Sequence, residues 1–231
     1  IKSLSCVNNL SLTALNTSTL TKLEKLNISG STIATIDLSN NPRLKYLNVN
    51  KSSVSALLLE GNSDLEELYC SGLTALTNRT LILENHPMLW YLSCSESRLT
   101  HLDVTGCPKL VTLNCKSNSI PVLNLTNNES LEYLTCNKNV LTELDLPTRN
   151  NKISNIDCSD NKLSELDLQS CMKLTTLIFN NNLLTKLNLG SIPHITEITI
   201  ATKHSTLYTM EVRGELLESL VIDNNRSTSL R

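Results

Sequence analysis

The chain has 231 residues, of which 40% are hydrophobic and only 3% aromatic, and its formal net charge is −2. The near balance of 20 basic and 22 acidic residues argues against a nucleic-acid-binding or polybasic membrane-surface protein, because both classes depend on clustered Lys and Arg. No apolar run approaches the ~18 residues of a membrane span, so we expect no membrane insertion by this segment.

A short apolar motif recurs along the whole chain in two interleaved series. The first series defines face B and has its central residues at Leu4, Leu26, Leu47, Leu68, Leu92, Leu113, Leu134, Ile156, Leu177, Ile198 and Leu220. The second series defines face A and has them at Leu15, Ile36, Leu57, Leu81, Leu102, Leu123, Leu144, Leu166, Leu187 and Met210. The step within either series is usually 21 residues, which predicts one short strand per series in every turn.

Two consecutive units show the pattern in full: residues 110–120 read LVTLNCKSNSI and residues 120–131 read IPVLNLTNNESL. Both fit L-x-x-L-x-(C/L)-x-x-N, which resembles the leucine-rich repeat. More narrowly, the pattern is similar to the nested 21-residue bacterial subclass called IRREKO, in which both halves of a unit carry the motif. The resemblance implies a mainly β repeat solenoid: a right-handed leucine-rich-repeat stack of about ten 21-residue turns, with short parallel strands on both sides and little helix.

The alternation of side chains along a strand predicts which residues form the core. Leu113 and Cys115 should point inward while Asn114 points outward. Six of the eight cysteines fill the same inward position that Leu, Ile, Val or Phe fills in other turns: Cys6, Cys70, Cys94, Cys115, Cys136 and Cys158. Since buried Cys behaves as a small hydrophobic residue and no Cys-x-x-Cys pair occurs, we expect unbridged thiols.

Asn ends many of the units and is expected to pair backbone groups at the corners. These residues are Asn9, Asn118, Asn139, Asn161, Asn182 and Asn225 after face B, and Asn41, Asn62 and Asn128 after face A.

Two segments depart from the period, because Leu68 to Leu81 takes 13 residues and Ile198 to Met210 takes 12. Insertions of this kind map to corner loops, sometimes on the binding side. We interpret residues 1–231 as one solenoid domain, and as a fragment of a longer or processed chain because no polar capping unit is visible.

No motif of catalytic chemistry occurs: there is no G-x-S-x-G, H-E-x-x-H, P-loop or G-x-G-x-x-G. The resemblance implies no common catalytic residue either, so we expect no enzyme and no cofactor. One cluster of carboxylates, Glu143, Asp145, Glu165 and Asp167, is expected on the outward positions of two adjacent turns of face A. We expect it to be a solvated acidic surface without bound metal; a Ca²⁺ site or a site for a basic partner is the alternative.

Five of the seven aromatic residues are predicted to lie outward on face B: Tyr46, Tyr69, Trp90, Tyr91 and Tyr133. Three interpretations remain open at this point. Tyr favours exposed strand positions, rigid rings with a polar rim anchor protein interfaces, and rings on a flat sheet can stack on sugars.

Taken together, the residues and the resemblance favour an extracellular or cell-surface binding module that recognises a protein partner through the aromatic-bearing face. A carbohydrate-binding accessory module and a structural spacer without a ligand are the alternatives. The bacterial and surface assignments are implied by the resemblance alone.

Overall fold

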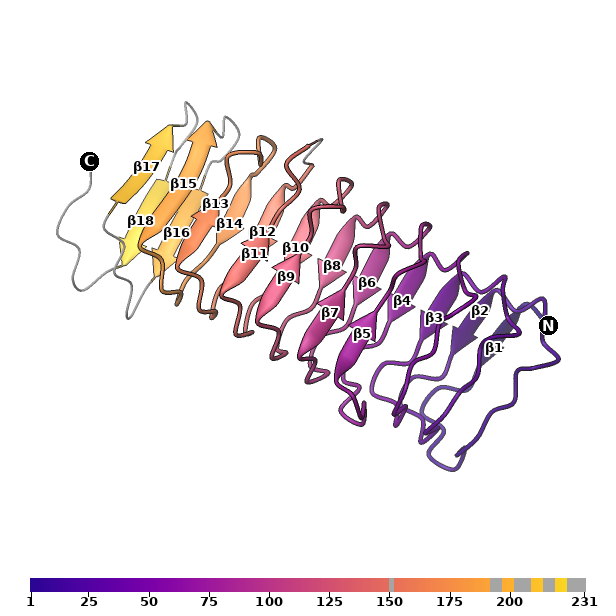
Figure 1. Cartoon of the computed structure of the whole chain (residues 1–231). Helices are drawn as coiled ribbons and strands as arrows, with labels where there is room; N and C mark the ends of the chain where they lie inside the picture. The colour runs from indigo at the N-terminus through magenta and orange to yellow at the C-terminus, as the bar shows by residue number, and fades with distance from the viewer. Residues whose placement is uncertain (150–151, 192–196, 202–208, 214–218, 224–231) are drawn as a thin grey trace.

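The structure is a computed structural model that describes residues 1–149, 152–191, 197–201, 209–213 and 219–223. These residues form an elongated stack of short parallel strands, and no helix occurs among them (Figure 1). The strands alternate between two sides of the stack, with the apolar core between the two sides. The repeat solenoid predicted from the sequence is confirmed.

Face B is one continuous parallel sheet of 11 strands. Each residue of the first series lies in register with the same residue of the next turn, for example Leu26 with Leu47 and Leu113 with Leu134. The strands are β1 (Ser3–Ser5), β2 (Lys25–Asn27), β3 (Tyr46–Asn48), β4 (Glu67–Tyr69), β6 (Tyr91–Ser93), β8 (Thr112–Asn114), β10 (Tyr133–Thr135), β12 (Asn155–Asp157), β14 (Thr176–Ile178), β16 (Glu197–Ala201) and β18 (Ser219–Asp223).

Face A, unlike face B, is not one continuous sheet. Its strands form three separate sheets, β5–β7, β9–β11 and β13–β15–β17, preceded by an isolated bridge between Asp37 and Leu58. The strands are β5 (Thr80–Ile82), β7 (His101–Asp103), β9 (Val122–Asn124), β11 (Glu143–Asp145), β13 (Glu165–Asp167), β15 (Lys186–Ser191) and β17 (Thr209–Arg213). No strand forms around Leu15.

Two of the three breaks in face A have local causes in the sequence. The first separates Leu58 from β5, where the long step to Leu81 adds residues. The second separates β7 from β9: Thr100 and Thr142 each donate their N–H to the preceding turn, whereas Pro121, in the corresponding position between them, has no N–H to donate. The third separates β11 from β13, where the step is 22 residues; the step of 23 residues between β15 and β17 leaves those strands paired, so length alone does not explain this break.

The inward residues form a single apolar core that runs through the stack. Leu110, Leu113 and Cys115 are all 0% exposed, and Asn114 between them is only half-buried, as the alternation predicts. Burying each Leu contributes roughly 1.5–3 kcal/mol. Because every turn repeats the same inward columns, each short strand is stabilised by the turns above and below it rather than by its own length.

Four of the predicted asparagine corners after face B form a ladder, whereas Asn9 in the first turn is exposed. The Asn118 amide donates from Nδ2 to the carbonyls of Cys94 and Cys115 at 3.0 and 2.8 Å, and its Oδ1 accepts the N–H of Leu99 at 2.9 Å. Asn139, Asn161 and Asn182 repeat this arrangement one turn further on each time. Asn225 lies outside the described residues. Each amide thus ties its own turn to the preceding turn.

The residue before each ladder position adopts a left-handed backbone. Its φ is between 53° and 56° wherever it is not glycine, and the positions are Asn8, Lys51, Glu96, Ser117, Lys138, Asp160 and Asn181. Gly30 and Gly72 occupy the same column with φ of 66° and 73°. The column marks a corner of constant geometry along face B.

All eight cysteines are unbridged, which agrees with the prediction. Five consecutive turns of face B place Cys70, Cys94, Cys115, Cys136 and Cys158 in one buried column. Burial raises the pKa of the Cys70, Cys115 and Cys158 thiols to about 12, since the thiolate would lose its hydration. These side chains are neutral packing groups.

Candidate functional site

Four of the five predicted aromatic residues meet in one cluster on face B. The ring centroids of Tyr46 and Tyr69 lie 5.3 Å apart, and those of Tyr69 and Tyr91 lie 4.8 Å apart. Trp90 packs edge-on against Tyr91 at 5.8 Å. Tyr69 stands in a neighbouring outward column, yet its ring leans across β4 and bridges the two other tyrosines. We call Tyr46, Tyr69, Trp90 and Tyr91 the aromatic cluster.

Polar groups hold the aromatic cluster in place. The Tyr69 hydroxyl donates to Oε2 of Glu67 at 2.9 Å, and the Asn48 amide donates to the Tyr46 hydroxyl at 3.4 Å. Partial burial, and secondarily the bond to Glu67, raises the pKa of Tyr69, so the hydroxyl remains a donor under ordinary conditions. The rings therefore have fixed positions, and little side-chain entropy is left to lose on binding.

Tyr133 does not belong to the aromatic cluster. It pairs in register with Thr112 and Asn155, neither of which is aromatic. Its side chain is 48% exposed, compared with 40% for Trp90. The five outward rings predicted from the sequence are thus a compact group of four, on β3, β4, β6 and the residue before β6, with one isolated ring on β10.

A charged edge borders the aromatic cluster. Lys45, which precedes Tyr46, forms an ion pair of 2.7 Å with Glu66, which precedes Glu67 on the next turn. The hydrogen bond to Glu66, and secondarily the Coulombic attraction of that carboxylate, raises the pKa of Lys45, so this amine stays charged. The sequence interpretation missed the pair, although both residues occupy the same position of the repeat and their spacing of 21 residues could have revealed it.

The carboxylate cluster on face A is divided by a break in the sheet. Glu143 and Asp145 lie on β11, which pairs only with β9, whereas Glu165 and Asp167 lie on β13, which pairs only with β15. A groove of about 530 Å³ lies between them and is lined by Asp145 and Asp167. The four carboxylates lie on two adjacent turns, as expected, but the strands that carry them are not paired.

Several acidic side chains of face A also have a structural role that sequence reasoning missed. Oδ1 of Asp37 accepts the N–H of Ser39, Oδ1 of Asp103 accepts the N–H of Thr105, and Oδ1 of Asp167 accepts that of Gln169. These Asx turns satisfy backbone groups where each strand ends. Asp145 lacks this bond, since Pro147 two residues later has no N–H.

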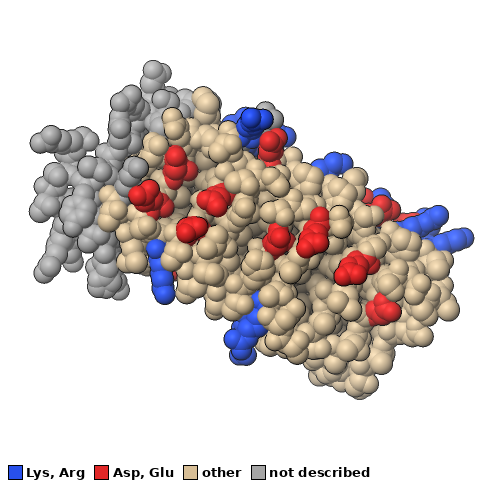
Figure 2. Space-filling view, viewed as in Figure 1, with Lys and Arg blue, Asp and Glu red and all other residues tan. Residues whose placement is uncertain are grey.

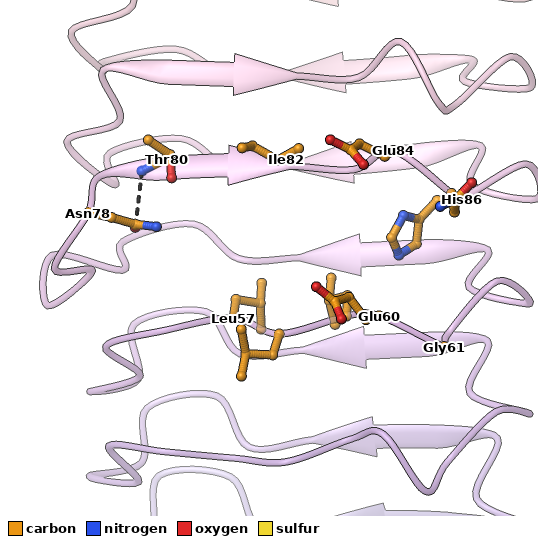
Figure 3. Close-up of a pocket in the computed structure, with 11 residues that line it drawn as sticks. Leu57, Glu60, Gly61, Asn78, Thr80, Ile82, Glu84 and His86 are labelled. Carbon is orange, nitrogen blue, oxygen red and sulfur yellow. Dashed lines mark hydrogen bonds between the residues drawn. The ribbon is translucent and has the colours of Figure 1, made fainter.

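A second groove lies on face A at the first break. It has a volume of about 540 Å³ and lies between residues 57–61 and the segment that contains β5. Figure 3 shows Leu57 and Glu60 on one side and Thr80, Ile82 and Glu84 on the other, with the imidazole of His86 between the two turns.

Within the described ranges, no three His, Cys, Asp or Glu side chains are grouped so that they could hold a metal ion. The described residues also contain no helix that is both long and apolar enough to cross a membrane. Figure 2 shows acidic side chains across the middle of the face that carries β5, β7, β9 and β11, and Lys and Arg along its rims. The groups that the two faces expose include aromatic rings, carboxylates and backbone edges.

No protein-family model matches the sequence, and a comparison with curated proteins gives no match. Solved structures do resemble it. The functional domain of InlJ from Listeria monocytogenes, which includes a cysteine ladder, matches with 29% identity and a TM-score of 0.75 over 96% of this chain and 53% of that one. A leucine-rich-repeat protein from Leptospira interrogans matches with 20% identity and a TM-score of 0.60, over 92% of this chain and 66% of the other.

The chain has the leucine-rich-repeat fold. An LRIM1/APL1C complex shows the same fold, with 21% identity and a TM-score of 0.62 over 88% of this chain and 44% of that one. This leucine-rich-repeat chain therefore spans between 44% and 66% of the length of these three structures.

Proposed function

We propose that this leucine-rich-repeat chain is a binding module that recognises a protein partner through face B, with the aromatic cluster as the anchor. The observation that carries the proposal is the packing of Tyr46, Tyr69, Trp90 and Tyr91 into one group with a polar rim. Partly exposed rings that are already ordered contribute contact area at low entropic cost. Tyr133 would be a separate, weaker contact at the edge of the same face.

The ring geometry favours a protein partner over a glycan. A sugar stacks on an open ring face, but Tyr46, Tyr69 and Tyr91 are tilted by 42° and 31° against one another and are half-buried. In the aromatic cluster only Trp90, at 40% exposure, offers a large free surface. A spacer without a ligand would have no need for fixed rings that share one face.

The similar structures support a binding role in general terms, since LRIM1/APL1C is a complex of two proteins. We also propose that the chain is not an enzyme, that it acts at the cell surface or outside the cell, and that residues 1–231 form one solenoid domain. The nested bacterial subclass is proposed on the strength of the motif in both halves of each unit and the strands on both sides.

Site-specific photo-crosslinking tests the proposal. A photoreactive phenylalanine analogue replaces Tyr91 in the aromatic cluster or, as the matched control, Thr176, which is exposed on β14 of the same face. We expect crosslinks to a defined protein from the Tyr91 position and none from Thr176.

The double variant Trp90→Ala/Tyr91→Ala should then weaken binding of that protein by about 2 kcal/mol or more, or roughly 30-fold. Glu143→Ala/Asp145→Ala on face A should leave the affinity unchanged. If the face A variant loses binding and the face B variant does not, the aromatic cluster is only a strand preference and the proposed site is wrong.

A further inference from the structure

The groove at the first break of face A has two strand edges without partners. β5 pairs with β7 on one side, with Leu81 in register with Leu102, and with nothing on the other side. Leu58 bridges to Asp37 on the far side only. No backbone hydrogen bond joins residues 57–61 to residues 80–86, all of which the structure describes. The facing backbone edges of both turns are therefore open to an added strand, except at the Thr80 N–H, which donates to Oδ1 of Asn78 at 3.3 Å (Figure 3).

The two walls of the groove carry the same side-chain pattern. Residues 57–60 read LLLE and residues 81–84 read LILE. The outward Leu58 and Ile82 are 64% and 50% exposed, which is unusual for large aliphatic side chains of this chain, and Glu60 and Glu84 follow at the same end. No Lys or Arg lines the groove. Its volume of about 540 Å³ lies within the range of ligand-binding clefts.

His86 points to a ligand independently of the strand edges. It occupies the ladder position after face A. At that position Asn62 donates to the carbonyls of Leu38 and Asn41. Three turns after Asn62, Asn128 donates to the equivalent carbonyls of Val104 and Cys107. His86 is only 4% exposed, and neither ring nitrogen makes a hydrogen bond of ordinary geometry, although the backbone of Leu59 and Leu83 lies close to the ring. A buried polar group left without a partner costs ~1–3 kcal/mol.

The ring of His86 projects into the space between the two turns (Figure 3). Burial lowers the pKa of His86, and the nearby Leu59 and Leu83 carbonyls oppose this only in part. The imidazole is therefore neutral near pH 7 and offers one donor and one acceptor.

We propose that this groove is a second binding site, which takes an extended peptide segment of a protein partner as an added strand on the free edge of β5. An aliphatic side chain of the peptide lies between Leu58 and Ile82, basic side chains lie beside Glu60 and Glu84, and His86 bonds a polar group of the bound segment. Addition of a strand to an open sheet edge derives its affinity from main-chain bonds and its specificity from alternate side chains. The site is independent of the aromatic cluster, which lies on the opposite face.

The test uses the full chain and a fluorescent seven-residue peptide of alternating lysine and valine, with binding followed by anisotropy. Ile82→Lys places a charge on the wall of the groove and should weaken binding at least ten-fold. Val122→Lys is the matched control, since Val122 is 40% exposed on β9 and does not line the groove, and it should bind like the parent. Trp90→Ala/Tyr91→Ala should also leave peptide binding unchanged, which separates this site from the proposed function.

Two further experiments test the charge preference of the groove and the role of backbone hydrogen bonds. Glu60→Lys/Glu84→Lys should reverse the preference, so that a peptide of alternating glutamate and valine binds instead. A lysine–valine peptide in which alternate amides are N-methylated should lose its affinity. N-methylation removes the N–H donors along one edge of the extended peptide, which can then no longer donate hydrogen bonds to β5.

Three results would overturn the proposal. They are absence of binding by the unmodified peptide at millimolar concentration, equal binding by the Ile82→Lys and Val122→Lys variants, and equal binding of the N-methylated peptide. Self-association of the chain that Ile82→Lys abolishes would assign the groove to a second copy rather than to a peptide partner.

Discussion

The two faces of the solenoid are built from the same repeat, yet face B is continuous and face A is broken. Face B keeps its 11 strands in register even where its own step rises from 21 to 24 residues, between Leu68 and Leu92. The same additional residues separate Leu58 from β5 on face A. At this turn the extra chain leaves the sheet of face B intact and interrupts face A.

The corners explain why face B tolerates the extra residues. After the five face B strands from β6 to β14, an Asn or Ser side chain bonds the backbone of two successive turns. Ser97 does so where the step is longest, by donating to the carbonyl of Cys70 and accepting the N–H of Leu73. Face A has fewer such residues, because His86, Cys107 and Cys171 stand where amides are expected. A face held by corner bonds can serve as a rigid platform, whereas a broken face offers grooves.

The largest expected contrast concerns the thiols of the face B column. In the native protein, Cys6 is half-buried and should react with a thiol reagent within minutes, whereas Cys70, Cys94, Cys115, Cys136 and Cys158 are buried and should react orders of magnitude more slowly. Mass spectrometry of the labelled protein identifies the reactive site. In denaturant without reductant, all eight thiols should be counted, and finding three or more disulfides would refute the packing interpretation.

Loss of one corner bond should have the next largest effect. Asn139→Ala removes the amide that donates to the Cys115 and Cys136 carbonyls and the Oδ1 that accepts from Ile120, which should cost ~1–3 kcal/mol of unfolding free energy. Lys138→Ala, one residue away and exposed, should stay within about 0.5 kcal/mol. Urea unfolding measures both. Equal effects would mean that the corner does not hold face B together.

The broken face should show a pH dependence that the continuous face lacks. Burial lowers the pKa of folded His86 below its unfolded value of 6.5, so the unfolded chain binds the proton more tightly. The stability contributed by neutral His86 is complete above pH 6.5 and is lost as the pH falls toward the folded-state pKa. Between pH 7.5 and pH 5.5 the parent should lose more unfolding free energy than His86→Asn, while His101→Asn, at an exposed position, should match the parent. An equal loss in all three would exclude this role.

The smallest expected effect is at the carboxylates around the third break. Ca²⁺ needs six to eight converging oxygens, and the break separates Glu143 and Asp145 from Glu165 and Asp167. Millimolar Ca²⁺ should therefore leave the melting temperature nearly unchanged. A rise of several degrees that Glu165→Gln or Asp167→Asn abolishes would instead show that the two strands close around a cation.

The register of the fold could be read from the sequence because the period of 21 fixes which residues stack. Leu26, Leu47 and Leu68 pair as their spacing predicts, and the inward Cys and corner Asn residues follow from the same count. The outward position of the five aromatic residues on face B followed as well.

The 21-residue period did not predict the breaks in face A or the grouping of the aromatic rings. Whether two neighbouring strands form hydrogen bonds depends on single residues, such as Pro121 with its missing N–H. A repeat pattern does not record such differences between turns. Whether Tyr69 reaches Tyr91 depends on a side-chain torsion selected by its bond to Glu67. The hydrogen bonds from the backbone to the carboxylates of Asp37 and Asp103 were not predicted either, because carboxylates at outward positions were expected only to be solvated.

Glycine substitutions in the left-handed corner column could also raise the stability of this scaffold. The left-handed conformation destabilises the folded state by about 1–2 kcal/mol when the residue is not glycine. Glycine instead loses roughly 0.5–1 kcal/mol through the added backbone entropy of the unfolded chain, so the replacement should be stabilising. Lys51→Gly, Glu96→Gly and Lys138→Gly lie two turns apart, at about 10 Å, where effects on stability add. Such substitutions change neither the aromatic cluster nor either groove, so a more heat-resistant scaffold can keep both of its recognition surfaces.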